Sequence, residues 1–226
     1  MNLNDVNGGL IKNSKVDGVL LGDDHRQDYE YFDLDVLREL GSIGAGHAAT
    51  AMSEILQEPV SIDIPRIYAI PPHMVLKYYN MHDQPATAIY MQLNGDYDCD
   101  ILLLFDVEEE RKLAALMTMA SSPDEVDPEM GASAIVELGN ILIGSFLSAI
   151  ADFAGVTLVP TTPQRVVDTF DAILDHFLVK QAMLSNLSLI FEAQFKRKSG
   201  DASCILIVFP SRELSQILID KAKKFI

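Results

Sequence analysis

Two segments of the chain resemble each other without a gap. Residues 35–65 align with residues 133–163 at a constant offset. The positions that keep the same residue are Glu39, Leu40, Gly41, Ile43, Gly46, Ala51 and Pro65 in the first segment, and Glu137, Leu138, Gly139, Ile141, Gly144, Ala149 and Pro163 in the second. Each segment has the apolar spacing of a long helix followed by a strand region. A repeat of this length indicates a duplicated unit, so the two halves of the chain are expected to fold alike.

The likeness continues beyond these helices. Residues 86–105 and 187–209 each contain two β-rich runs around a turn with Gly and Asp, which predicts two hairpins. We align Phe105 with Phe209, which leaves the second half slightly longer than the first. A helical pattern follows each hairpin. The sequence therefore predicts an α+β fold: one compact domain built from two pseudo-twofold related repeats, each a long helix, a β-hairpin with further strands, and another helix.

We expect three parts along the chain. Residues 1–30 carry Asn, Gly and Asp with little periodicity, which is typical of a flexible N-terminal tail. The first repeat then covers residues 31–120, and the second covers residues 121–226.

The two long helices have recognisable start and stop signals. Asp33 and Asp127 are the expected N-caps, and a proline follows Asp127 at the first helical position. Pro59 limits the first helix. Gly155 stands where a C-cap glycine would end the second.

Polar residues interrupt an apolar helical run in the second repeat. Ser133, Glu137 and Asn140 recur at helical spacing within residues 133–144, where most other residues are apolar. The three side chains therefore fall on one face of the helix. Burying an unpaired carboxylate and carboxamide would cost several kcal/mol. The stripe is either simply the solvent-facing side of the helix or a functional site.

The first repeat carries a related face, with Asp35, Glu39 and Ser42 at the corresponding positions. Both helices also place a glycine on the same side as the glutamate, Gly46 in the first and Gly144 in the second. A glycine within a helix costs roughly 0.5–1 kcal/mol relative to alanine, so it needs a reason. Either a partner molecule approaches the helix closely there, or helices of the same domain pack tightly. The sequence leaves both explanations open.

The composition argues against several functions. The chain has 226 residues, of which 33 are acidic and 17 basic, and its formal net charge is −16. Nucleic acids and anionic membrane surfaces require clustered Lys and Arg, so neither is an expected partner. Glu137 and Asn140 interrupt the most apolar long segment, which argues against membrane insertion. No secretory signal is visible, and Cys99 and Cys204 are expected as buried thiols, so we predict a cytoplasmic protein.

No motif for a resident cofactor or metal is recognisable. The five histidines lack the spacing of metal ligands. Residues 41–48 are rich in glycine, but they lie within a helical pattern and no lysine follows them, so they are not a phosphate-binding loop. The polar face also lacks a nucleophile. We therefore expect neither a cofactor nor a metal in this chain.

A carboxamide beside a carboxylate can instead complete a site on another molecule. The carboxamide can accept a hydrogen bond from a water and donate one to a phosphoryl oxygen. It can therefore hold a water in line with a phosphorus atom. A neighbouring glutamate can pair with a lysine of the partner and fix the docking.

The polar pattern resembles the signature of the CheC/CheX/FliY family, in which an Asp or Ser, a Glu, an Asn and a distant Pro recur at this spacing. Members of that family are phosphatases that act on the phosphorylated chemotaxis response regulator CheY. The second repeat matches this signature at Ser133, Glu137, Asn140 and Pro163. The first repeat matches at Asp35, Glu39 and Pro65 and has Ser42 where the family has Asn. The chain is most similar to CheC, because it has two copies of the motif and no flagellar-switch domain.

The resemblance implies a mechanism and a partner. A CheY-like receiver holds a labile aspartyl phosphate, a Mg²⁺ ion and a lysine, so the magnesium is expected on the substrate. Glu137 would contact the receiver's lysine, and Asn140 would orient the attacking water. Ser133 and Gly144 would belong to the docking surface. The residues of a degenerate first site would be Asp35, Glu39 and Ser42.

Two other functions remain open. One is an adaptor with little or no catalytic activity, which binds phosphorylated CheY or the receptor deamidase CheD, a partner of CheC relatives. The other is a phosphatase of a receiver outside chemotaxis. A turnover assay separates an adaptor from an enzyme, because an adaptor binds the phosphorylated receiver without raising phosphate release.

Overall fold

The computed structural model describes residues 34–78, 83–184, 188–196, 201–222 and 224. The predicted tail over residues 1–30 and the expected N-cap Asp33 lie outside these ranges. The elements of the first half are α2 (Leu34–Leu56), β1 (Ser61–Ile70), η1 (Pro72–Met74), α3 (Val75–Tyr78), β2 (Pro85–Gly95), β3 (Cys99–Asp106) and α4 (Val107–Met117). Those of the second half are η2 (Pro123–Glu125), α5 (Pro128–Ala154), β4 (Leu158–Pro160), β5 (Gln164–Thr169), α6 (Phe170–Leu184), β6 (Ser188–Lys196), β7 (Ala202–Pro210) and α7 (Arg212–Ala222).

Seven strands of the described residues form one antiparallel sheet in the order β1-β6-β7-β3-β2-β4, and β5 also pairs with β2. The two predicted hairpins, β2–β3 and β6–β7, meet at the centre, where β3 pairs with β7. The first strand of each half pairs with the hairpin of the other half: β1 with β6, and β4 and β5 with β2. The predicted α+β class with two pseudo-twofold related repeats is confirmed, and the repeats exchange their first strands.

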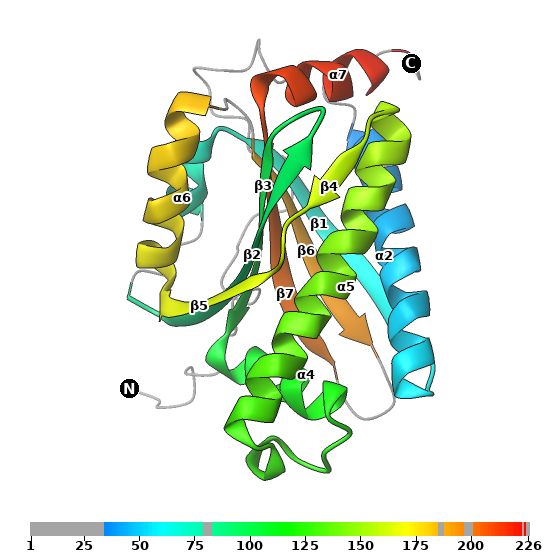
Figure 1. Cartoon of the computed structure of the whole chain (residues 1–226), viewed down its shortest axis with the longest axis vertical. Coiled ribbons are helices and arrows are strands. Elements are labelled where there is room, and N and C mark those ends of the chain that lie inside the picture. Colours follow the sequence, from blue (N-terminus) through cyan, green and yellow to red (C-terminus); the bar gives the residue numbers. More distant parts are fainter. Residues whose placement is uncertain (1–33, 79–82, 185–187, 197–200, 223, 225–226) are drawn as a thin grey trace, which may run out of the picture.

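The sheet separates two layers of helices (Figure 1). On one face α2 and α5 lie antiparallel and side by side, with α4 and α7 at opposite ends of the sheet, while α6 covers the other face. Side chains alternate along each strand, so the central strands contribute to two cores. In β3, for example, Leu103 faces the two long helices and Leu102 faces α6.

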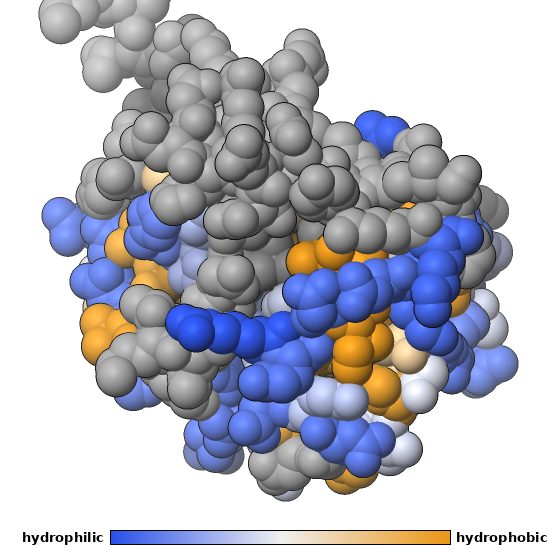
Figure 2. Space-filling view, turned by 90° about the horizontal axis from the view of Figure 1, so that it is seen from above, coloured by the Kyte–Doolittle hydropathy of each residue, from blue (hydrophilic) through white to orange (hydrophobic). Residues whose placement is uncertain are grey.

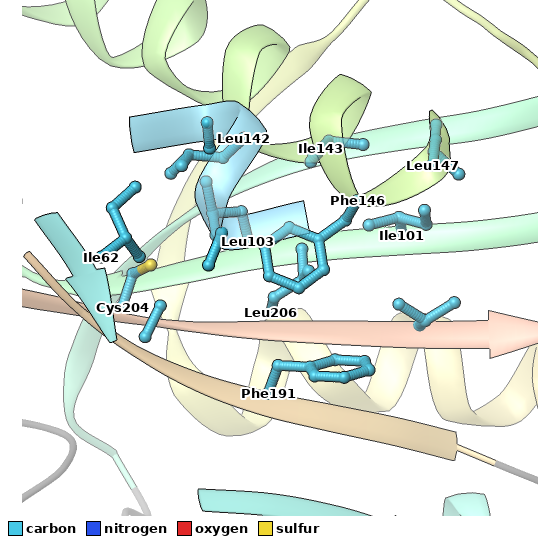
Figure 3. Close-up of a cluster of buried hydrophobic side chains, with 14 of the residues drawn as sticks. Ile62, Ile101, Leu103, Leu142, Ile143, Phe146, Leu147, Phe191, Cys204 and Leu206 are labelled. Carbon is cyan, nitrogen blue, oxygen red and sulfur yellow. The ribbon is translucent and has the colours of Figure 1, made fainter. Parts of the chain in front are cut away.

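The larger core lies between the sheet and the two long helices. Phe146 of α5 points toward Phe191 of β6, with ring centroids 5.4 Å apart, and both side chains are buried (Figure 3). A Cβ built at Gly44 of α2 would lie 3.1 Å from the Cα of Phe146. The two helices therefore cross closely at Gly44 and Phe146.

The two cysteines are buried free thiols, as predicted. Cys204 lies within the larger core (Figure 3). Burial raises the pKa of the Cys99 thiol, and it likewise raises the pKa of the Cys204 thiol. Both thiols therefore stay protonated at neutral pH, which makes them poor nucleophiles and suits a structural role.

The predicted signals at the ends of the long helices agree with the structure. The Oδ1 atom of Asp127 accepts hydrogen bonds from two backbone N–H groups of the first turn of α5. Gly155 has a φ of 71°, the left-handed conformation that favours glycine, and its N–H donates to a carbonyl of the last turn. The first long helix ends at Leu56, shortly before Pro59.

The predicted order of elements lacks a helix between the strand region and the hairpin of each repeat. The structure has the short α3 at this place in the first repeat and the much longer α6 in the second. The apolar residues that α6 buries against the sheet are Phe170, Ile173, Leu174, Phe177 and Leu178. The greater length of α6 accounts for the extra residues of the second half.

The alignment of Phe105 with Phe209 is wrong. Phe105 lies in the core beneath α2 and α5, whereas Phe209 lies in the core beneath α6. Side chains alternate along a strand, so equivalent residues of the two repeats must face the same side of the sheet. In the correct alignment of the two repeats, the residue of β7 that corresponds to Phe105 is therefore an odd number of positions away from Phe209.

Among the described residues, α5 is the one helix long and apolar enough to cross a membrane. Its apolar side chains, including Ile135, Leu138, Leu142 and Phe146, are buried in the larger core. The composition of α5 is therefore accounted for by its packing on the sheet and on α2. The described surface at the α7 end is mainly hydrophilic, with hydrophobic residues in small groups (Figure 2).

Candidate active site

The polar face of α5 lies in a short segment in which exposed and buried residues follow each other. Glu137 and Asn140 are exposed, while Leu138 and Gly139 between them are buried. Ser133, one turn earlier, is exposed as well. Because the apolar pair is anchored in the core, the helical twist directs the acid and the carboxamide outward. The stripe therefore faces the solvent.

Gly139 brings this part of α5 close to the sheet. A Cβ built at Gly139 would lie 2.5 Å from the Cγ2 atom of Ile89 in β2, so the close approach requires a glycine. Gly41 holds the equivalent place in α2, where a Cβ would lie 3.2 Å from the Cδ1 atom of Phe191 in β6. Each long helix thus rests on the hairpin of the other repeat. The core fixes the backbone that carries Asn140.

The two outward glycines have no packing role within the described structure. Gly46 is exposed and Gly144 is half-buried, and a Cβ built at either position would meet no atom of the described residues within 4 Å. Tight packing between helices was one of the two explanations left open by the sequence, and the described helices give no such packing at these positions. No described residue fills the space above either glycine, which fits the other explanation, close approach of a partner molecule.

The polar side chains of the α5 face are available to a partner. Within the described ranges, Ser133, Glu137 and Asn140 have no side-chain hydrogen bond or ion pair to the rest of the chain. Among the described residues nothing uses their hydrogen-bonding capacity, which leaves it for solvent or a docked molecule. Binding does not first require breaking an internal contact of these three side chains.

The face on α2 has the same framework with different chemistry. Glu39 and Ser42 are exposed, and Gly46 follows on the same side of the helix. Asp35 lies within α2, but its side chain is outside the described residues. A shallow hollow of about 360 Å³, with β1 and β6 forming its other walls, opens beside Ser42 and Gly46. The first face therefore presents a hydroxyl where the second presents a carboxamide.

The distant proline of the pattern interrupts the edge of the sheet. Pro163 lies between β4 and β5, which both pair with β2. Thr161 holds the connection: its N–H donates to the Gln92 carbonyl (2.8 Å), and its Oγ1 accepts from the Gln92 N–H (3.0 Å). A proline has no N–H to continue such pairing, which separates the two strands. Pro65 lies within the register shift of β1.

The second face has one further exposed residue that was not predicted from the sequence. Met130 lies in the first turn of α5, on the same side as Glu137, and the residue is 58% exposed. Its spacing from Glu137 could have indicated it. Within the described ranges, no three His, Cys, Asp or Glu side chains form a group that could hold a metal ion.

Comparison with known proteins shows which proteins this chain resembles. A family model described as CheC-like matches residues 32–67 and 130–167, the two segments that contain the polar faces. The CheY-P phosphatase CheC of Bacillus subtilis is 27% identical over 164 residues, which cover 70% of this chain and 78% of that protein. The flagellar motor switch phosphatase FliY of the same species is 28% identical over 121 residues, or 52% of this chain and 31% of FliY.

Solved structures share the fold. FliY of Thermotoga maritima superposes with a TM-score of 0.63 at 18% identity, covering 84% of this chain and 95% of that chain. The middle domain of FliM from H. pylori gives a TM-score of 0.57 at 10% identity, covering 83% and 97% of the two chains. These likenesses support the α+β architecture. The two segments matched by the family model contain its paired long helices, α2 and α5. The chain is therefore similar to the CheC-like family over the two segments that carry its polar faces.

Proposed function

We propose that this protein is an aspartyl-phosphate phosphatase that acts on a phosphorylated CheY-like receiver in chemotaxis signalling. The observation that carries the proposal is the outward pair Glu137 and Asn140, which has no internal partner among the described residues and stands on a helix held rigidly by the core. The relatives named CheY-P phosphatase and motor switch phosphatase support the same chemistry.

In the proposed reaction the α5 face covers the phosphorylated aspartate of the receiver. The Asn140 carboxamide accepts a hydrogen bond from a water and donates one toward a phosphoryl oxygen, so the water lies in line with the phosphorus. The water oxygen attacks phosphorus, the bond to the aspartyl oxygen breaks, and inorganic phosphate leaves. Holding the water in this geometry removes much of the entropic part of the barrier.

Glu137 has a docking role in this proposal. Its carboxylate pairs with the lysine of the receiver site, which fixes the position of α5 over the phosphate. Ser133 and Gly144 extend the contact on either side, and the absent side chain of Gly144 allows the receiver backbone to approach closely. The Mg²⁺ ion belongs to the receiver and arrives with the substrate.

Phosphate release from a purified, phosphorylated CheY receiver, measured with and without this protein, tests the proposal. A catalytic amount of the protein should raise the rate well above the spontaneous rate. An unchanged rate over a range of protein concentrations would contradict it.

The loss of the carboxamide in the first face favours a second candidate, an adaptor. Ser42 leaves that face able to contact a receiver through Glu39 without efficient hydrolysis. Such a protein would bind phosphorylated CheY, or CheD, mainly through α2. Binding of the phosphorylated receiver at a site that survives Glu137→Gln, with no gain in phosphate release, would identify this role.

Glu137→Gln should weaken binding of the receiver by roughly tenfold, because it removes the charge that pairs with the receiver's lysine. The salt dependence of association should also fall, since one attraction between opposite charges is lost. Affinity can be measured by titration at two ionic strengths. A large loss of turnover at unchanged affinity would instead make Glu137 a catalytic group.

Ser42→Asn should create a second working face. A serine hydroxyl is shorter than a carboxamide and cannot fix a donor and an acceptor in one plane, and an error near 1 Å in positioning can cost about 10²-fold in rate. The substitution is best tested in an Asn140→Ala background, where phosphate release should rise by about 10²-fold. No recovery in a folded protein would mean that the first face has also lost its docking surface.

A further inference from the structure

Met130 is the one large hydrophobic residue of α5 that is exposed. It lies in the first turn, directly after the cap formed by Asp127, which accepts a hydrogen bond from the Met130 N–H at 3.0 Å. Helical geometry places Met130 within about 20° of Glu137 around the helix axis. The stripe that begins at Met130 continues through Ser133, Glu137 and Asn140.

The distances along α5 place Met130 within reach of a docked receiver. Seven residues separate Met130 from Glu137 and ten separate it from Asn140, which at 1.5 Å per residue gives about 10 Å and about 15 Å. An interface of ordinary size buries about 800 Å² on each partner, which corresponds to a disc with a radius of about 16 Å. A receiver centred on Glu137 and Asn140 therefore covers Met130.

The chemistry of the remaining stripe gives Met130 a distinct role. Its other outward positions are Ser133, Gly144 and Ser148, which are polar or small, and Ile141, which is half-buried and packs against the larger core. Met130 is therefore the large apolar side chain of the stripe that is mostly exposed. Interfaces concentrate binding energy in a few large side chains. Methionine is enriched at interfaces, where its unbranched thioether can adapt to the partner. The exposed charges of the stripe alone give orientation more than affinity.

We propose that Met130 is the apolar anchor that seats the receiver on α5, by entering an apolar depression beside the receiver's phosphorylated site. This inference rests on the proposed function, because it assigns the receiver as the occupant. The anchor acts in binding and does not touch the reacting atoms, which lie near Asn140. Loss of the anchor should therefore affect affinity and leave the rate of the bound complex unchanged.

The test uses the full chain and two readouts. Affinity is measured for a CheY receiver carrying beryllofluoride and Mg²⁺, a stable mimic of the phosphorylated state, and turnover is measured at saturating phosphorylated receiver. Met130→Ser should raise Kd roughly tenfold and leave kcat unchanged. Met130→Leu, which keeps the apolar volume, should retain affinity within about twofold.

Val179→Ser is the matched control. Val179 is also an exposed aliphatic residue on a helix, 73% exposed, but it lies on α6, across the sheet from α5. It should change neither Kd nor kcat. The anchor role of Met130 would be overturned by an unchanged Kd for Met130→Ser, or by an equal loss of receiver affinity in Val179→Ser. If the wild type binds the receiver in a Met130-dependent way but releases no phosphate, the proposed phosphatase function is overturned and the anchor stands.

Discussion

Asn140→Ala is expected to lower phosphate release from a phosphorylated receiver by a factor on the order of 10²–10³, the scale for losing one positioned polar group in a reaction centre. The carboxamide fixes an acceptor for the water and a donor for a phosphoryl oxygen in one plane, which the shorter serine hydroxyls of the α5 stripe cannot do. The rate at saturating receiver is the relevant measurement, because it separates chemistry from docking.

Thermal melting provides the control for this variant. Asn140 is exposed and has no side-chain partner among the described residues, so Asn140→Ala should melt like the wild type. Alanine also favours the helix slightly more than asparagine does. Equal phosphate release by the folded variant and the wild type would rule out Asn140 as the residue that positions the water.

Gly139→Ala is expected to lower the free energy of unfolding by about 1–3 kcal/mol or more, the range for overpacking a filled core. The new Cβ would lie 2.5 Å from Cγ2 and 2.9 Å from Cβ of Ile89, and the latter atom is attached directly to the β2 backbone. Rotation of a flexible side chain cannot relieve this clash, so α5 or β2 has to move. Urea unfolding measures the change.

Gly144→Ala is the matched variant on the same helix. No atom of the described residues lies within 4 Å of its added Cβ, so helix propensity should dominate and stability should rise by about 0.5–1 kcal/mol. Equal stability changes for Gly139→Ala and Gly144→Ala would contradict the packing described for α5. Loss of receiver affinity in the more stable Gly144→Ala protein would further support close approach of a partner there.

Local patterns were enough to predict the framework of the site. The spacing of Ser133, Glu137 and Asn140 reports helix periodicity directly, and the structure places all three side chains on the exposed side of α5. The caps at Asp127 and Gly155 are likewise set by residues close in sequence. The role of these side chains toward a receiver stays a prediction, because it depends on a second molecule.

The remaining features depend on contacts between distant residues. The exchange of β1 and β4 between the repeats depends on pairing partners far along the chain, which periodicity does not reveal. The side of the sheet on which Phe209 lies depends on the strand register. A register shift of one residue moves every side chain of a strand to the opposite side. Gly139 is packed against the sheet, whereas no described atom lies close to Gly144. Telling these two roles apart requires knowledge of which face of the helix meets the sheet.

The exchange of strands between the repeats also means that a change in the chemistry of one outward face need not remove the half that carries it. β1 completes the edge of the sheet beside β6, and α2 rests on Phe191 through Gly41, so the second half depends on the first for its fold. Ser42 lies on the exposed side of α2, so a change from asparagine to serine at this position would leave those contacts untouched. Selection for a folded protein therefore retains the whole first repeat as a scaffold, while its outward residues are free to drift or to acquire a different partner.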